Sequence, residues 1–178
     1  MKIRSVAVVP AVLAAAVVLI ASPASAAGVH IGFGFNGRDI SGAPTGAATL
    51  TGGGSYIPGT SFAKSAGGFR CTSDVRQGPL AGCLAGQGVR WDTAALLAST
   101  TFTCTGEAEP TATTNNHTVV LLADFYRAGD GNDESFTAKM IVSDDDIAPG
   151  INGIQNVWIQ GVGCASAIAA NFSSSPGS

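Results

Sequence analysis

The sequence predicts an all-β protein, a small closed or nearly closed antiparallel barrel of about seven to eight strands, with a β-sandwich as the alternative. Apolar and polar residues alternate with a period of two along much of the chain. These segments are short and are separated by clusters of Gly, Pro, Asn and Asp. Glycine pairs also interrupt some of them, and because a tightly curved sheet needs glycine at its corners, they favour the barrel.

The first 26 residues have the pattern of a secretory signal peptide. Lys2 and Arg4 form a basic start, an apolar run densest over 11–21 follows, and 24–26 reads Ala-Ser-Ala, a small-x-small cleavage site. A membrane-spanning helix needs about 20 apolar residues, and this run is shorter. We therefore expect export without a stable membrane anchor, to the extracellular space or the cell envelope.

Removing these 26 residues from the 178 leaves 152, which suits a single domain. We expect the β domain over 27–172 and a disordered tail over 173–178. Loss of Lys2 and Arg4 takes the net charge from −3 to −5. Nucleic acids and anionic membranes attract basic surfaces, so this acidic balance argues against both as partners.

The first half of the domain is predicted to hold three strands. Apolar residues at every second position indicate the first. The next two form a hairpin around Pro58 and Gly59, with glycine kinks at 52–54 and 67–68. The expected strands are 29–36, 48–57 and 60–71, followed by a long connection without periodicity over 72–90.

The middle of the domain is less regular. Asp92 is placed to cap one short helix, with an irregular loop as the alternative. A strand should follow with Phe102 and Cys104 on one face, and then a polar surface loop. The expected elements are a helix over 93–98, a strand over 100–105 and a loop over 107–117.

The clearest hairpin lies in the second half. Apolar and β-branched residues predict strands over 118–127 and 134–143, around Gly-Asp-Gly-Asn turn chemistry at 128–133. We expect a further strand over 155–164 and a last short strand over 165–172.

Four cysteines lie in the predicted mature region: Cys71, Cys83, Cys104 and Cys164. Their spacings of 12, 21 and 60 residues contain no close metal-binding pair, and thiols of exported proteins oxidise, so two disulfides are expected. Three pairings are possible. We expect Cys71–Cys83, which closes the long connection locally, and Cys104–Cys164, which ties a central strand to the last one.

The search for a catalytic site is mostly negative. His30 and His117 are the only histidines, the first directed outward on a strand and the second beside a polar loop. The chain has no G-x-S-x-G turn and no G-x-G-x-x-G opening a helix. We therefore expect no catalytic residue and no cofactor.

Acidic residues gather in one part of the sequence. Seven of the twelve fall between 124 and 146, namely Asp124, Asp130, Asp133, Glu134, Asp144, Asp145 and Asp146. Asp130, Asn132 and Glu134 alternate like the ligands of a calcium loop, but the glycine and the distant bidentate glutamate of an EF-hand are missing. A plain turn is expected, with a calcium site at these three residues as the alternative.

Asp124 differs from the other acids because it interrupts an apolar strand. Directed inward, it needs a cationic partner, for which Arg90, Arg127 and Arg70 are the candidates. Directed outward, it is an ordinary surface residue. An enzyme built on this chain would use Asp124, Arg90 and Arg127 as its catalytic groups.

The mature region resembles uncharacterised exported proteins of actinobacteria. The segments that carry the resemblance are Gly-Gly-Phe-Arg-Cys (67–71), Gly-Pro-Leu-Ala-Gly-Cys (78–83), Gly-Val-Arg-Trp-Asp (88–92) and Phe-Tyr-Arg-Ala-Gly-Asp-Gly-Asn-Asp-Glu-Ser-Phe (125–136). This resemblance implies bacterial export and no particular activity. In addition, the glycine-rich strand, turn and strand over 49–69 resemble a barrel hairpin of the allene oxide cyclase and dirigent type, from which no catalytic residue carries over.

Two functions follow as expectations. The favoured one is a secreted, disulfide-stabilised, non-enzymatic β domain that binds or structures an extracellular ligand or envelope component. The alternative is a small barrel isomerase or cyclase that acts on an apolar molecule in the lumen. A filled interior supports the first, and an open cavity holding Asp124, Arg90 or Arg127 supports the second.

Overall fold

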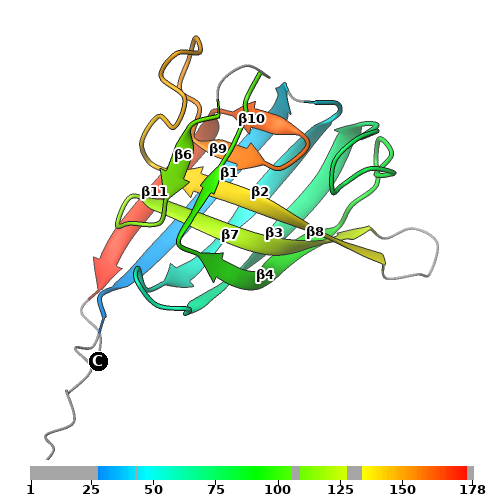
Figure 1. The fold of residues 1–178 in the computed structure, drawn as a ribbon. Coiled ribbons are helices and arrows are strands. Elements are labelled where there is room, and N and C mark those ends of the chain that lie inside the picture. The colour runs from blue at the N-terminus through cyan, green and yellow to red at the C-terminus, as the bar shows by residue number, and fades with distance from the viewer. Residues whose placement is uncertain (1–27, 43, 106–108, 128–133, 176–178) are drawn as a thin grey trace, which may run out of the picture.

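The computed structural model describes residues 28–42, 44–105, 109–127 and 134–175. Within these ranges the regular structure consists of strands and contains no helix, so the all-β prediction is confirmed. Eight strands form an antiparallel ring in the order β1-β2-β3-β4-β7-β8-β9-β10, and β10 pairs with β1 to close it (Figure 1). β11 also pairs with β1, while β5 and β6 form a separate two-stranded sheet.

The strand bounds are β1 His30–Gly42, β2 Ala47–Tyr56, β3 Ala63–Ser73, β4 Arg90–Leu97, β5 Ser99–Thr101, β6 Thr111–Thr113, β7 Thr118–Arg127, β8 Glu134–Ser143, β9 Val157–Ile159, β10 Gly163–Ala165 and β11 Ala167–Ser175. The expected hairpins β2–β3 and β7–β8 are present, and the β7–β8 register runs unbroken from Thr118 opposite Ser143.

β1 closes the ring by pairing with two strands along one of its edges. Its first half pairs with β11 and its end pairs with β10, where Ser41 lies opposite Cys164. The pairing with β11 is irregular between Phe35 and Gly37. β1 therefore runs well past residue 36, the expected end of the first strand, because its final residues form the seam of the ring.

Glycines at the β2–β3 corner let the backbone and an indole ring approach closely. Gly52 on β2 lies opposite Gly67 on β3. A Cβ added to Gly67 would lie 1.8 Å from the carbonyl oxygen of Thr51 and 2.6 Å from Nε1 of Trp91. That same Nε1 donates a 2.9 Å hydrogen bond to the Thr51 carbonyl. The expected role of glycine in a curved sheet thus has a specific steric cause here.

Apolar side chains fill the inside of the ring, and we call them the inner core. The largest fully buried members include Trp91, Tyr56 and Phe125. The members come from the ring strands, from the 74–89 connection and from β11, and include Ile31, Phe33, Leu50, Phe69, Val75, Leu80, Leu121, Met140, Ile159 and the partly buried Phe172. The ring strands, the long connection and β11 thus all contribute apolar side chains to the interior of the ring.

A second apolar cluster lies outside the ring. Val120 of β7, Ile141 of β8 and Trp158 of β9 point away from the inner core and are buried in a cluster with residues of the β5–β6 hairpin and of the segment 144–156. Figure 1 shows β6 in front of the ring strands. We call this hairpin, this segment and the outward side chains they cover the outer layer. Burial on both faces explains the continuous apolar runs in β7 and β8, which a sheet with one wet face would not show.

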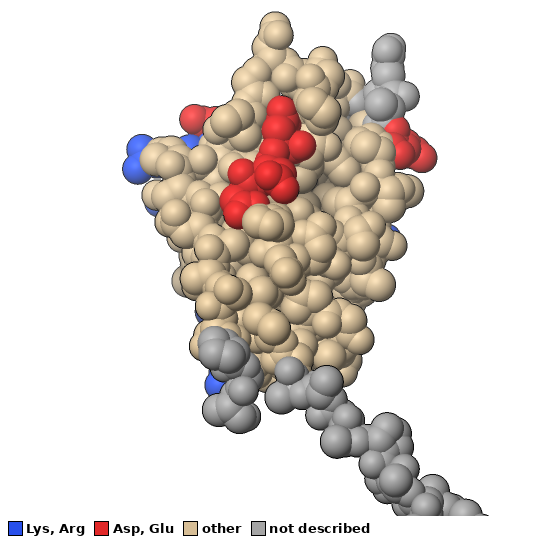
Figure 2. Space-filling model, turned by 90° about the vertical axis from the view of Figure 1, so that its left-hand side faces the viewer, with Lys and Arg blue, Asp and Glu red and all other residues tan. Residues whose placement is uncertain are grey.

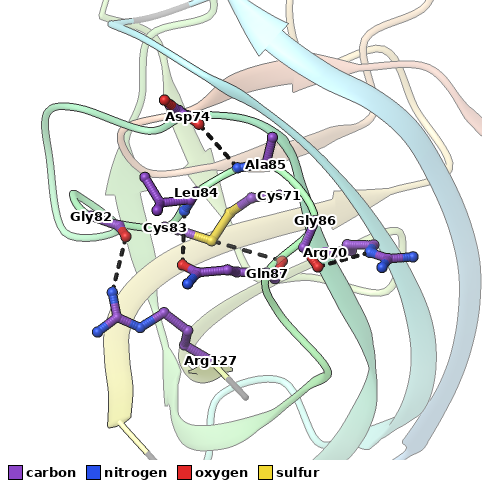
Figure 3. Close-up of a disulfide and its surroundings, with 10 residues drawn as sticks. All are labelled: Arg70, Cys71, Asp74, Gly82, Cys83, Leu84, Ala85, Gly86, Gln87 and Arg127. Carbon is purple, nitrogen blue, oxygen red and sulfur yellow. Dashed lines mark hydrogen bonds between the residues drawn. A yellow bond between two sulfur atoms is a disulfide. The ribbon is translucent and has the colours of Figure 1, made fainter. Parts of the chain in front are cut away.

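Both expected disulfides are present. Cys71–Cys83 closes the long connection beside the inner core, and Cys104–Cys164 joins the outer layer to β10. Around the first one, Leu84 N donates to the Gln87 side chain at 2.9 Å and Ala85 N donates to the Asp74 carboxylate at 3.0 Å (Figure 3). The connection is therefore an ordered part of the domain, although it contains no strand.

The helix predicted over 93–98 is wrong, because residues 93–97 belong to β4. Trp91 enters the inner core, and Asp92 lies opposite Asp124 of β7 instead of capping a helix. An irregularity in the register between Thr93 and Ala95 then places Leu96 against the inner core and Leu97 against the outer layer. Tertiary packing has overridden a local helical preference.

The segment after β4 is also more divided than expected. The strand predicted over 100–105 is reduced to β5, although Phe102 and Cys104 are both buried in the outer layer as their shared face predicted. The surface loop predicted over 107–117 contains β6, which pairs with β5.

Two further boundaries differ near the C-terminus. The strand predicted over 155–164 is a hairpin of β9 and β10, which turns at Gly161 with φ +85°. Ser173–Ser175, assigned to a disordered tail, pair with β1 in β11. The β1 edge supplies the backbone partners that make these serines strand residues, and their own composition gives no sign of it.

Candidate functional site

Asp124 lies on the outer side of β7 and does not face the ring interior. Its neighbours Ala123 and Phe125 enter the inner core, whereas Asp124 is half-buried and its Oδ1 accepts a 2.8 Å hydrogen bond from the Thr137 hydroxyl. The outward alternative is therefore the one the structure adopts.

The two arginines named with Asp124 as catalytic groups have other partners, Arg90 on the outer side of β4 and Arg127 at the long connection. The Arg90 guanidinium lies 4.3 Å from the centre of the Tyr126 ring, and Arg127 donates a 2.9 Å hydrogen bond to the Gly82 carbonyl. Partial desolvation raises the pKa of Tyr126, and the Asp92 and Asp124 carboxylates raise it further. Asp124, Arg90 and Arg127 thus belong to surface contacts and not to a lumen site.

Tyr56 is fully buried in the inner core, and its hydroxyl reaches backbone carbonyls before and at the start of β7. It donates a 2.6 Å hydrogen bond to the Asn115 carbonyl and lies 3.3 Å from the Thr118 carbonyl. Burial, and secondarily the negative charge of Asp144, raise the pKa of Tyr56 far above its usual value. Every buried side-chain nitrogen or oxygen of the described residues has a hydrogen-bond partner. The inner core therefore offers no unsatisfied polar group to a substrate.

The calcium candidate falls largely outside the described residues. Asp130 and Asn132 lie within 128–133, which is not described, and Glu134 is the first residue of β8. The calcium site at these three residues stays a prediction.

The two histidines lie in different surroundings. The His30 ring packs edge-on against Phe62, with ring centres 5.2 Å apart. His117 precedes β7, and its Nδ1 lies 3.2 Å from Oδ2 of Asp144, the residue that follows β8. The sequence places His117 and Asp144 27 residues apart, so only the β7–β8 register reveals that they meet.

An apolar pocket opens on the outer layer, and we call it the outer pocket. Its cavity volume is about 320 Å³, which lies at the lower end of the range for small-molecule sites. It is lined by Cys104, Thr105, Pro110, Ile147, Ala148, Pro149, Gly150 and Ile151. None of these eight residues carries a titratable side chain, since Cys104 is in a disulfide.

Hydrogen bonds fix the wall of the outer pocket formed by the segment 144–156. The Asp146 carboxylate accepts bonds from Ala148 N at 3.0 Å and from Gln155 N at 3.1 Å. Ile151 N donates to the Ala148 carbonyl at 3.0 Å. The sequence signal for this pocket is weak, because a short apolar stretch around Pro149 does not reveal which surface it faces.

No helix among the described residues is both long and apolar enough to cross a membrane. The two disulfides indicate folding in an oxidising compartment. Comparison with protein-family models, with curated proteins and with solved structures gives no match.

Proposed function

We propose that this chain is an exported, disulfide-stabilised β domain with a non-enzymatic binding role outside the cell, and that it receives an apolar ligand group in the outer pocket. The N-terminal signal pattern and the two disulfides support export.

One contrast carries the proposal. The inner core is filled by apolar side chains, whereas the outer pocket is an open apolar concavity. Catalysis by acid, base or nucleophile needs positioned titratable groups, and the lining of the outer pocket contains none. Such a surface suits binding, in which apolar area is removed from water without chemistry.

The pocket wall is also preorganised. The Cys104–Cys164 disulfide anchors one side to β10, and the Asp146 carboxylate holds the turn that presents Ala148 and its neighbours. A wall that is ordered before binding lowers the entropy lost on binding.

A titration of the folded protein with small cyclic hydrocarbons and aromatic alcohols, followed by amide NMR, tests the binding site. We expect saturable shifts of the amides of Cys104, Thr105, Ile147, Ala148, Gly150 and Ile151. Pro149→Glu places a charge on an exposed residue of the lining and should weaken binding about tenfold, or 1.4 kcal/mol.

Ile154→Glu is the matched control for this titration. Ile154 lies in the same segment, is 55% exposed and does not line the outer pocket, so binding should be unchanged. Shifts elsewhere only, or equal loss in the two variants with unchanged melting temperatures, would contradict the proposed site.

The non-enzymatic role is tested by a hydrolase and isomerase screen on the mature domain. We expect no turnover of ester, peptide, glycosidic or apolar cyclic substrates. Turnover by the wild type would replace the binding role with an enzymatic one, and its loss in Asp124→Asn, with an unchanged melting temperature, would place the active site on the outer side of β7.

A further inference from the structure

The ends of the β7–β8 hairpin bring three metal-binding side chains together on the surface. His117 directly precedes β7, and Asp144 and Asp145 directly follow β8. One ligand atom from each of them lies within 4.8 Å of the other two. We call these three residues the His–Asp cluster. His117 is 27 residues from Asp144 in the sequence and meets the two aspartates because Thr118 pairs with Ser143.

Hydrogen bonds that involve the buried Ser143 and the backbone hold the residues of the cluster in position. Asp144 N donates a 3.1 Å hydrogen bond to the His117 carbonyl, which also accepts one of 3.1 Å from the Ser143 hydroxyl. The same hydroxyl accepts a 3.0 Å bond from Asp145 N and lies 2.8 Å from the Thr118 hydroxyl. Ser143 is fully buried. The three ligand-bearing residues are thus held together by a network that does not use their side chains.

His117 is the described residue that pairs with an acidic side chain of the cluster, that of Asp144. Among the described residues, no Lys or Arg lies within ion-pair distance of Asp144 or Asp145. Asp146 is not part of the cluster, and its Oδ1 accepts the two backbone hydrogen bonds of the outer layer. Figure 2 shows a compact acidic strip at the centre of one face, surrounded by uncharged surface, with other charged groups at the edges of the view.

We propose that the His–Asp cluster binds a divalent transition-metal ion of the zinc class. An imidazole nitrogen with two carboxylate oxygens suits zinc, cobalt or nickel, whereas calcium takes six to eight oxygen ligands at about 2.3–2.6 Å. Three protein ligands leave a coordination position for water, as in zinc sites that are not closed by a fourth side chain. This inference is separate from ligand binding in the outer pocket.

Isothermal titration of the tag-free mature protein with ZnCl₂ at pH 7.5 tests the proposal, and CoCl₂ provides an absorption signal for the same site. We expect one saturable zinc per chain. His117→Gln and Asp145→Asn should each weaken zinc binding about tenfold or more, and Ca²⁺ at the same concentration should not compete.

His30→Gln is the matched control, because it removes the other histidine and leaves the cluster intact. Zinc affinity should be unchanged in this variant. His117 and Asp145 are exposed, so the metal-free variants should keep the wild-type melting temperature, which is measured alongside. Absence of saturable zinc binding, equal binding in His117→Gln, or loss of binding in His30→Gln would each overturn the proposal.

Discussion

The inner core and the outer layer are both apolar and each contains a disulfide, but different interactions hold them in place. The inner core is enclosed by the ring, in which each strand pairs with neighbours on both sides. The outer layer rests on one face of β7–β9 and is fastened by Cys104–Cys164. The paired strands of the ring therefore determine the fold. The outer layer adds a surface on which we place the proposed binding site, and changes in this surface need not alter the ring.

The largest expected effect is the loss of unfolding free energy when a large side chain is truncated in the inner core, compared with a truncation in the outer layer. Trp91→Ala empties the middle of the inner core and removes the indole hydrogen bond, so the free energy of unfolding should fall by about 3–5 kcal/mol. Phe102→Ala, in the outer layer, should cost about 3 kcal/mol or less, because the short β5–β6 hairpin can collapse around the gap. Urea denaturation measures both, and a larger loss for Phe102→Ala would reverse the comparison.

The next largest effect is the loss of unfolding free energy when either disulfide is removed. Replacing both cysteines of Cys104–Cys164 by Ala should lower the free energy of unfolding by about 4 kcal/mol, and the same change at Cys71–Cys83 should lower it by about 3 kcal/mol. The difference follows from the longer loop, since the separations are 60 and 12 residues. Denaturation of the two double variants decides this, and equal or inverted losses would show that chain entropy is not the main factor.

A smaller effect depends on pH. Because the pKa of Tyr56 is raised in the folded state, its contribution to stability is fully present below the unfolded tyrosine pKa of about 10 and is lost as pH rises above it. Stability should therefore fall between pH 10 and alkaline unfolding. Tyr56→Phe should flatten this fall more than Tyr126→Phe, whose phenol is at the surface. An unchanged slope in Tyr56→Phe would contradict the burial of its hydroxyl.

The smallest expected effect concerns Asp124. Asp124→Asn keeps an oxygen that can accept the Thr137 hydrogen bond, so the loss in unfolding free energy should stay below about 1 kcal/mol. Thermal unfolding checks this. A loss of several kcal/mol would mean that the carboxylate compensates a buried charge, as the inward orientation required.

Sequence reasoning predicted the parts of this fold that have a strong local signal. The period of two in β1 and the turn residues predicted the strand class and the two main hairpins, and the places of the cysteines in the predicted strands and connection predicted the disulfide pairing. It failed where long-range pairing decides the structure. Leu96 and Leu97 favour a helix locally, and Ser173–Ser175 become a strand only because the β1 edge is available.

The candidate sites were harder to predict for the same reason. The meeting of His117 with Asp144 depends on the β7–β8 register, and the outer pocket depends on a segment folding back over the ring. Neither has a motif in the sequence. Asp124, which did stand out there, lies on the outer surface because the strand alternation places Ala123 and Phe125 inside.

Site-resolved hydrogen exchange on the native protein and on the Cys104→Ala/Cys164→Ala variant tests most directly whether the outer layer is separable from the ring. Loss of the disulfide should remove protection from the amides of β5, β6 and 147–156, while those of β2, β3 and β7 stay protected and lose no more than the variant loses in global free energy of unfolding. Uniform loss of protection across both regions would contradict the account, because the outer layer would then be part of one cooperative core with the ring.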